Sequence, residues 1–168
     1  MSAPTMTEEQ FWSLIDQARD GSPASASPDR MTEILAPLTD DEVSDFGLVF
    51  YGKLCDLNSW RLWGAGYVIA GGMSDDSFHY FRSWIVGKGR EVFDLARNDP
   101  DALGPFVDDP EVENELLEYV AVEVLRDRGV DLDPRTRSDR SPDFNPTGEP
   151  FEEDTVAADF PELAAQFG

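Results

Sequence analysis

The sequence predicts an all-α protein, a single compact helical domain of about seven helices followed by an extended proline-rich C-terminal arm. Three observations predict this fold class. Apolar residues recur at helical spacing through the first 130 residues. Residues that favour helix starts precede these runs. No segment shows the apolar and polar alternation of a half-buried strand. The 168 residues are enough for one domain with a sizeable core.

Capping signals predict the first three helices. In a capping box, a Ser or Thr is followed three residues later by Glu or Gln, and each side chain bonds the other residue's backbone N–H. Thr7 with Gln10 and Thr39 with Glu42 form this pattern. Pro28 is a residue type favoured at the first position of a helix. The predicted helices span residues 7–21, 27–38 and 39–57.

Four further helices are predicted after them. Gly71 is suited to end one, because glycine readily takes the left-handed conformation found there. Ser74 begins the next, with two aspartates in the first turn where the helix dipole favours anions. Pro110 begins a long helix that Gly129 ends. The predicted helices span residues 59–71, 74–86, 90–97 and 110–129.

The composition changes in the last part of the chain. Four prolines among many polar residues oppose regular structure there. We expect an extended arm that lies on the helical body and ends in a short helix over residues 161–167. The alternative is a disordered acidic tail. The predicted division is a helical domain, 1–130, and an arm, 131–168, that packs on it or trails from it. Phenylalanines spaced like anchors along this arm are Phe144, Phe151, Phe160 and Phe167.

Composition excludes several classes of function. The chain has 35 acidic and 13 basic residues and a net charge of −22, so it would be repelled by nucleic acid and by anionic lipid. We therefore expect neither nucleic-acid nor membrane partners. The single Cys55 forms no thiolate cluster and no internal disulfide, which suits a reducing cytoplasm. No leader and no apolar run near the roughly 20 residues of a spanning helix is present. We expect a cytoplasmic protein without a cofactor.

Residues 59–98 form a balanced segment in an otherwise acidic chain. This segment holds five basic residues against four acidic ones, together with three of the four tryptophans. Such a segment is either the most buried part of the protein or a concave site, and both interpretations place it inside. Its charged residues are Arg61, Asp75, Asp76, Arg82, Lys88, Arg90, Glu91, Asp94 and Arg97.

A row of polar residues lies on the helix predicted over 74–86. Asp75 and His79 are four residues apart, and Arg82 follows three residues later, so the three share one side of a helix beside its apolar face. The row could bind an anion or carry acid–base chemistry, because imidazole titrates near neutral pH. Alternatively, Asp75 only marks the helix start, Arg82 forms an ion pair and His79 faces water. No metal site is predicted, because one His offers too few nitrogen ligands.

Glu123 is an acidic residue within an apolar stripe of the predicted long helix. It shares that stripe with Val112 and Leu116. A buried carboxylate must find a partner or stay protonated, and Arg82 or Arg90 is the candidate partner. Glu123 is therefore part of a buried pair, or a site acid, or on a stripe that faces solvent at this end.

A long motif crosses the balanced segment. It reads WGAGY (63–67), GGMSDDSF (71–78), YFRSWI (80–85), GREVF (89–93) and DP (99–100). With EQFWSLI (9–15) and the late Pro146, Gly148 and Phe151, it resembles the bacterial domain of unknown function family 4240 over nearly the whole chain. The resemblance implies no activity and no catalytic residue. It implies that the shared motif includes Trp63, Asp75, Asp76, Arg82, Trp84, Arg90 and Glu91.

Two functions from different classes fit these observations. The first is a non-catalytic adaptor or inhibitor that docks on a basic partner protein, because an acidic field steers a cationic surface into contact. Acidity that serves solubility alone is the alternative to it. The second is a small-molecule-binding protein or an enzyme with an aromatic, polar cleft. We favour the first. The candidate ligand-binding residues are Trp60, Trp63, Tyr67, Asp75, Asp76, His79, Arg82, Trp84, Arg90, Glu91 and Glu123.

Overall fold

The computed structural model describes residues 4–143 and 145–168, and within them the all-α prediction is confirmed. Every secondary-structure element assigned in this part of the chain is a helix. One isolated β-bridge joins Ser59 to Thr147. The α-helices are α1 (Glu8–Arg19), α2 (Pro28–Leu35), α3 (Asp40–Asp56), α4 (Trp60–Ala70), α5 (Asp75–Gly87), α6 (Arg90–Asn98), α7 (Val120–Asp127), α8 (Val156–Asp159) and α9 (Pro161–Phe167). Short 3₁₀ helices are η1 (Pro100–Phe106), η2 (Glu115–Tyr119) and η3 (Pro134–Arg137).

The predicted capping boxes are present. The Thr7 hydroxyl accepts from the Gln10 N–H at 3.1 Å, and the Gln10 side chain accepts from the Thr7 N–H at 2.9 Å. Thr39 and Glu42 repeat both bonds at 3.2 and 3.0 Å. Gly71 ends α4 with a φ of 73°, the left-handed conformation expected of it. Local side-chain chemistry therefore determines where these helices begin and end.

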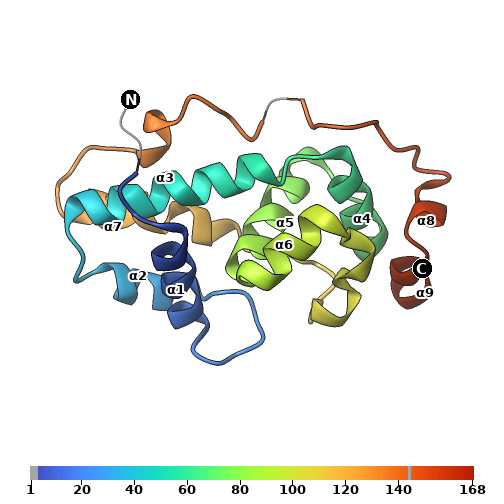
Figure 1. Ribbon diagram of the computed structural model, residues 1–168, viewed down its shortest axis with the longest axis horizontal. Coiled ribbons are helices and arrows are strands. Elements are labelled where there is room, and N and C mark those ends of the chain that lie inside the picture. The colour runs from blue at the N-terminus through green and yellow to red at the C-terminus, as the bar shows by residue number, and fades with distance from the viewer. Residues whose placement is uncertain (1–3, 144) are drawn as a thin grey trace.

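One hydrophobic cluster holds the helices together. Figure 1 shows α3 along the molecule, with α1, α2 and α7 toward one end and α4 to α6 further along. α3 contacts both α7 and α5, so it connects the two groups. Fully buried aromatic rings come from α1, α3 and α5 alike, namely Phe11, Phe46, Phe50, Phe78 and Phe81. No helix in the described part of the chain has the length and apolarity needed to cross a bilayer.

The prediction of a long helix over residues 110–129 is wrong for the first half of that range. A turn precedes the short η2, and only α7 is α-helical. Val112 is 1% exposed and has a φ of 41°, which lies outside the right-handed helical region. Asn114 then donates from its side chain to Ser25 Oγ and Ala26 O, both at 2.9 Å. Tertiary contacts override the helical pattern here.

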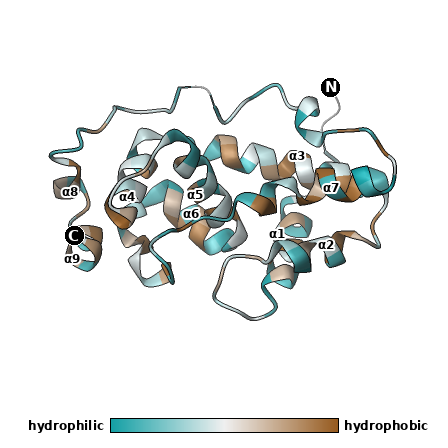
Figure 2. Ribbon diagram, turned by 180° about the vertical axis from the view of Figure 1, so that it is seen from behind, coloured by the Kyte–Doolittle hydropathy of each residue, from teal (hydrophilic) through white to brown (hydrophobic). Residues whose placement is uncertain are grey.

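The C-terminal residues pass along the helices and end in α8 and α9 at the end opposite α7 (Figure 1). α9 occupies the residues predicted for a short terminal helix. Figure 2 shows the extended part of this segment as mostly hydrophilic, whereas α8 is largely brown. Phe160 is buried, and Phe151 and Phe167 are partly buried against the core. Phe144, the remaining predicted anchor, lies outside the described residues.

Two glycines of the helical body leave room for this C-terminal segment. A Cβ on Gly47 of α3 would lie 2.8 Å from the Pro134 ring. A Cβ on Gly64 of α4 would lie 3.1 Å from side-chain atoms of both Phe160 and Val156. Both distances are shorter than ordinary van der Waals contact, so the absence of a side chain allows the close approach.

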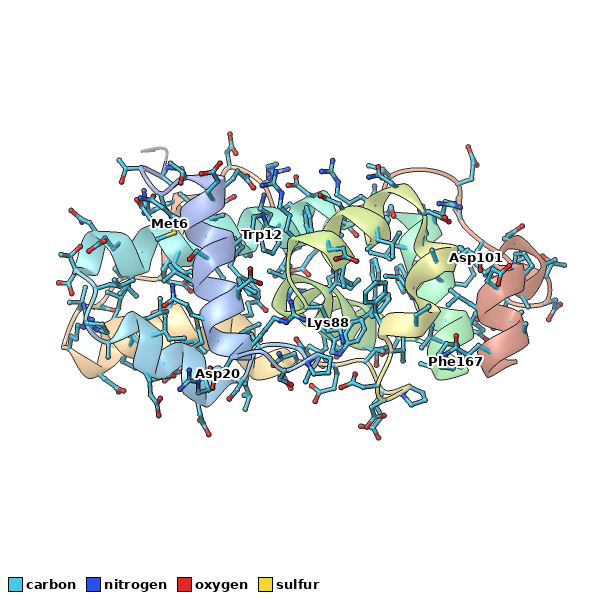
Figure 3. All side chains as sticks on the ribbon, turned by 60° about the horizontal axis from the view of Figure 1, so that its bottom comes forward. Met6, Trp12, Asp20, Lys88, Asp101 and Phe167 are labelled. Carbon is cyan, nitrogen blue, oxygen red and sulfur yellow. The ribbon has the colours of Figure 1, made fainter. Side chains whose placement is uncertain are left out.

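An aspartate of η1 holds the start of α9. The backbone N–H groups of Glu162 and Leu163 donate to the carboxylate of Asp101 at 3.2 and 3.0 Å. Figure 3 labels Asp101 where η1 approaches α9. Because the first N–H groups of a helix have no partner within it, this carboxylate caps α9 from another part of the fold.

Candidate functional site

Arg82 is buried, although it carries a charge. Its side chain lies on α5, and the residue is 3% exposed. One guanidinium nitrogen donates to the carbonyls of Leu54 and Pro142 at 3.2 and 3.0 Å, and the carbon of the group lies 4.4 Å from the Phe78 ring centroid. Burial lowers the pKa of Arg82 to about 10, so it stays cationic at neutral pH. Arg82 therefore joins α3, α5 and the C-terminal segment.

Aromatic rings of α4 form a stack that the C-terminal segment covers. Trp63 stacks between Trp60 and Phe78, with centroid distances of 5.0 and 4.8 Å. The Phe151 ring contacts Trp60, Trp63 and Tyr67 at 6.2, 6.4 and 5.5 Å. The aromatic wall predicted for a ligand cleft is therefore in contact with the chain's own Phe151.

A cleft of about 300 Å³ lies beside the first half of α5. We call it the His79 cleft. It brings together residues of α3, α5, η2 and the C-terminal segment, which are distant in sequence. Its lining residues are Tyr51, Asp75, Asp76, His79, Tyr80, Glu118, Tyr119, Arg135 and Asp143.

His79 and Glu118 form the deepest pair in the cleft. Nε2 of His79 lies 2.6 Å from Oε2 of Glu118, and Nδ1 lies 3.5 Å from an oxygen of Asp143. The Glu118 side chain is 3% exposed, whereas that of Asp143 is 76% exposed. The Nε2–Oε2 contact is a hydrogen bond in which the donor depends on the tautomer of the imidazole.

Arg135 lines the cleft, and the carboxylate of Asp133 already compensates its positive charge. Its guanidinium binds both oxygens of Asp133, with Nε to Oδ1 at 2.9 Å and Nη2 to Oδ2 at 2.6 Å. Its distance to Oε1 of Glu118 is 3.8 Å, which is too long for a hydrogen bond. Oε1 therefore makes no hydrogen bond within the part of the chain that the structure describes.

Three tyrosines contribute neutral hydroxyl groups to the cleft. Burial raises the pKa of Tyr51 and of Tyr119. Burial and the nearby carboxylates of Glu115 and Asp76 raise the pKa of Tyr80. All three phenols are therefore protonated at neutral pH and able to donate hydrogen bonds.

The Asp133–Arg135 pair makes stability depend on pH. Hydrogen bonds from Arg135 lower the pKa of Asp133 below its unfolded value of about 3.9. The stabilisation is therefore present above about pH 4 and is lost as the pH falls through the folded pKa. Asp133→Asn should lower the free energy of unfolding by about 1 kcal/mol at about pH 6 and by nearly nothing at about pH 2.5.

Urea unfolding at a series of pH values measures this difference. The control is Asp131→Asn, which changes an exposed carboxylate that has no ion pair with any described residue and should follow the wild-type pH dependence. An Asp133→Asn difference that is as large at low pH as at pH 6 would contradict the account.

The structure brings only some of the sequence-predicted site residues together. Asp75, Asp76 and His79 line the cleft, and Arg82 is not among the lining residues. Trp84 is a core residue, with the Lys88 ammonium 5.1 Å from its ring. The aromatic candidates of α4 are outside the lining of the cleft and contact Phe151 instead; they are Trp60, Trp63 and Tyr67. Arg90 and Glu91 are exposed at the start of α6 and are also outside the lining.

Glu123 is not a buried acid. Its side chain is 55% exposed and pairs with Arg126 at 2.9 Å, which is the solvent-facing alternative. The buried acid of this stretch is Glu118, which the sequence reasoning missed. A stripe drawn through the buried residues Val120, Ala121, Val124 and Leu125 would have found it. Glu118 precedes Ala121 by three positions and Leu125 by seven, so it shares their face.

The arrangement suits recognition of a cation. The cleft offers several carboxylate oxygens, phenol hydroxyls and tyrosine rings, and its one arginine, Arg135, is already paired with Asp133. No cluster of three His, Cys, Asp or Glu side chains in the described ranges is arranged to hold a metal ion. Hydrogen-bonding organic cations are therefore the ligand chemistry that fits.

Fold and site together define an all-α protein with an acid-lined cleft. The chain belongs to the family described as protein of unknown function (DUF4240), whose model matches residues 6–127. No curated protein matches the chain, and no solved structure does. The match ends before Arg135 and Asp143, so the cleft combines the family domain with residues that follow it.

Proposed function

We propose that this protein is a non-catalytic adaptor or inhibitor that binds a basic partner protein. The observation that carries the proposal is a group of carboxylates around the His79 cleft, which we call the acidic crescent. They come from the start of α5, the segment before α7 and the C-terminal segment. No Arg or Lys in the described residues lies within 4.0 Å of any of them. The crescent consists of Asp75, Asp76, Asp109, Glu111, Glu113, Glu115 and Asp143.

The crescent is concave. A second hollow, of about 560 Å³, lies beside the His79 cleft and shares Tyr80 with it. Asp109, Glu111 and Glu113 line this second hollow. Carboxylates therefore surround one tyrosine from both sides, and a tyrosine ring is a favourable surface for a guanidinium or ammonium group.

The chain's own cations do not neutralise this surface. Each of the 13 basic residues already contacts a carboxylate, a carbonyl or an aromatic ring elsewhere in the chain. Uncompensated carboxylates on a concave surface attract a positively charged protein and orient it on approach. Solubility alone requires no such concentration around one hollow.

Affinity capture with the full chain tests the proposal. A basic protein from the native cell should be retained at low salt and released at high salt, because salt screens the attraction. The variant Asp109→Asn/Glu111→Gln/Glu113→Gln should bind that protein at least about tenfold more weakly. Asn and Gln retain oxygen acceptors, which preserves the backbone hydrogen bonds that Asp109 and Glu113 accept.

The matched control removes the same charge elsewhere. Glu9→Gln/Asp29→Asn/Asp41→Asn changes three exposed carboxylates without ion pairs at the starts of α1, α2 and α3. It should retain most of the affinity. Equal losses in both variants would show unspecific attraction, and failure to retain any basic protein at low salt would overturn the proposal.

A further inference from the structure

We infer that the His79 cleft holds one arginine side chain of the basic partner, with Glu118 as the carboxylate that receives it. This inference rests on the proposed function, because the arginine belongs to that partner. It goes beyond it, because it assigns a ligand group and a receiving atom. A volume of about 300 Å³ is at the lower end of ligand pockets, which suits a single side chain.

Glu118 supplies the first argument. Its side chain is 3% exposed, and Oε2 is bonded to His79 at 2.6 Å. Oε1 has no hydrogen bond in residues 4–143 and 145–168, and Nη1 of Arg135 lies 3.8 Å from it. No fully buried side-chain oxygen or nitrogen of the described residues lacks a partner, so Oε1 reaches solvent, where a donor from outside can bond it.

Charge supplies the second argument. Asp133 compensates Arg135, so Arg135 adds little positive charge to the cleft. His79 contacts two carboxylates, those of Glu118 and Asp143, and can carry at most one positive charge. Asp75 and Asp76 add two exposed carboxylates at the rim, with no Arg or Lys beside them in the described residues. The cleft therefore has a deficit of positive charge that one guest cation would reduce.

The walls favour a guanidinium group over an ammonium group. Rings of Tyr51, Tyr80 and Tyr119 line the cleft. Within the protein, Arg135 already lies over the Tyr119 ring, with 5.6 Å between the guanidinium carbon and the ring centroid. A planar guanidinium stacks on such rings while donating in its plane to carboxylates, whereas an ammonium is a compact, strongly hydrated charge.

The sole histidine provides a direct probe of the cleft. In a tag-free full-length protein, all imidazole proton NMR signals come from His79. Titration with N-acetyl-arginine amide should shift these signals saturably. The neutral isostere Nα-acetyl-citrulline amide should bind at least about tenfold more weakly. Nα-acetyl-lysine amide, which keeps its side-chain ammonium group, should bind with intermediate affinity. Equal affinity for the arginine and citrulline probes, or no saturable shift, would overturn the inference.

Variants identify the receiving carboxylate. Glu118→Gln should weaken binding of the arginine probe about tenfold, because it removes the charge but keeps the shape. Asp143→Asn, an exposed change that leaves the fold intact, should weaken it about threefold. Asp139→Asn, an exposed carboxylate of the same segment outside the cleft, should change nothing. If Glu118→Gln does not fold, equal affinities of the Asp143 and Asp139 variants would overturn the inference.

The two proposals fail in different ways. If the arginine probe binds at His79 but no basic protein depends on the acidic crescent, the proposed function is wrong. If a basic protein depends on the crescent but Glu118→Gln and Asp143→Asn retain full affinity for it, the arginine inference is wrong and the proposed function stands.

Discussion

Arg82→Ala is expected to lower the free energy of unfolding by about 3 kcal/mol. The substitution removes both hydrogen bonds to the carbonyls of Leu54 and Pro142. It also removes the contact of the guanidinium with the Phe78 ring. Relief from burying a cation offsets part of this loss, which is why the expected value is not larger.

Urea denaturation followed by tryptophan fluorescence and by circular dichroism measures the effect. Arg126→Ala is the matched control, because Arg126 is exposed and its one ion pair among the described residues is with Glu123. It should cost less than about 1 kcal/mol. If Arg82→Ala loses no more free energy of unfolding than this control does, a structural role for Arg82 is contradicted. Arg82→Met, which keeps most of the packing, should lie between the two.

Leu163→Ala is expected to cost about 2–5 kcal/mol, as large-to-small changes in a core do. Leu163 lies on α9 near the C-terminus and is 0% exposed. The residue belongs to the same hydrophobic cluster as α1, α3 and α5. A terminal segment that merely trailed from the helices would tolerate the change.

Leu116→Ala is the control for this substitution. The chemical change is identical, but Leu116 is 65% exposed, so the cost should be below about 0.5 kcal/mol. Thermal unfolding of both variants measures the contrast. Equal stability of the two would contradict the packing of α9 against the helical body.

Local chemistry allowed most helix starts to be predicted. The capping residues Thr7, Thr39 and Ser74 act within one turn of the backbone they bond, so their effect is visible in a short stretch of sequence. The same holds for Gly71, whose conformation depends on its own backbone. The terminal α9 was predicted from its own residues, which begin with Pro161, although Asp101 caps it from another part of the fold.

Tertiary contacts determined what could not be predicted. Val112 has a left-handed backbone conformation and lies outside α7, so a stripe drawn through it did not describe that helix, on which Glu123 is exposed while the preceding Glu118 is buried. Pairing of Glu118 with His79 depends on chain segments 39 residues apart. Arg135 and Asp143 join the cleft through packing that no local pattern encodes.

The interpretation of the balanced segment depended on where its cations point. Arg82 lies inside and beside Phe78, whereas Arg90 is exposed and lies 3.9 Å from Asp94. Composition identifies a segment that is unusual as a whole. It does not separate the buried face of α5 from the exposed start of α6, because that depends on which side of each helix faces the core.

Hydrogen–deuterium exchange of the full chain with an arginine-rich peptide, such as nona-arginine, tests the central claim most directly. The claim is that basic partners bind at the His79 cleft and the acidic crescent. Binding should slow exchange at residues 75–80, 109–119 and 133–143. Slowed exchange confined to α1 and α2, or spread evenly over all acidic segments, would contradict it.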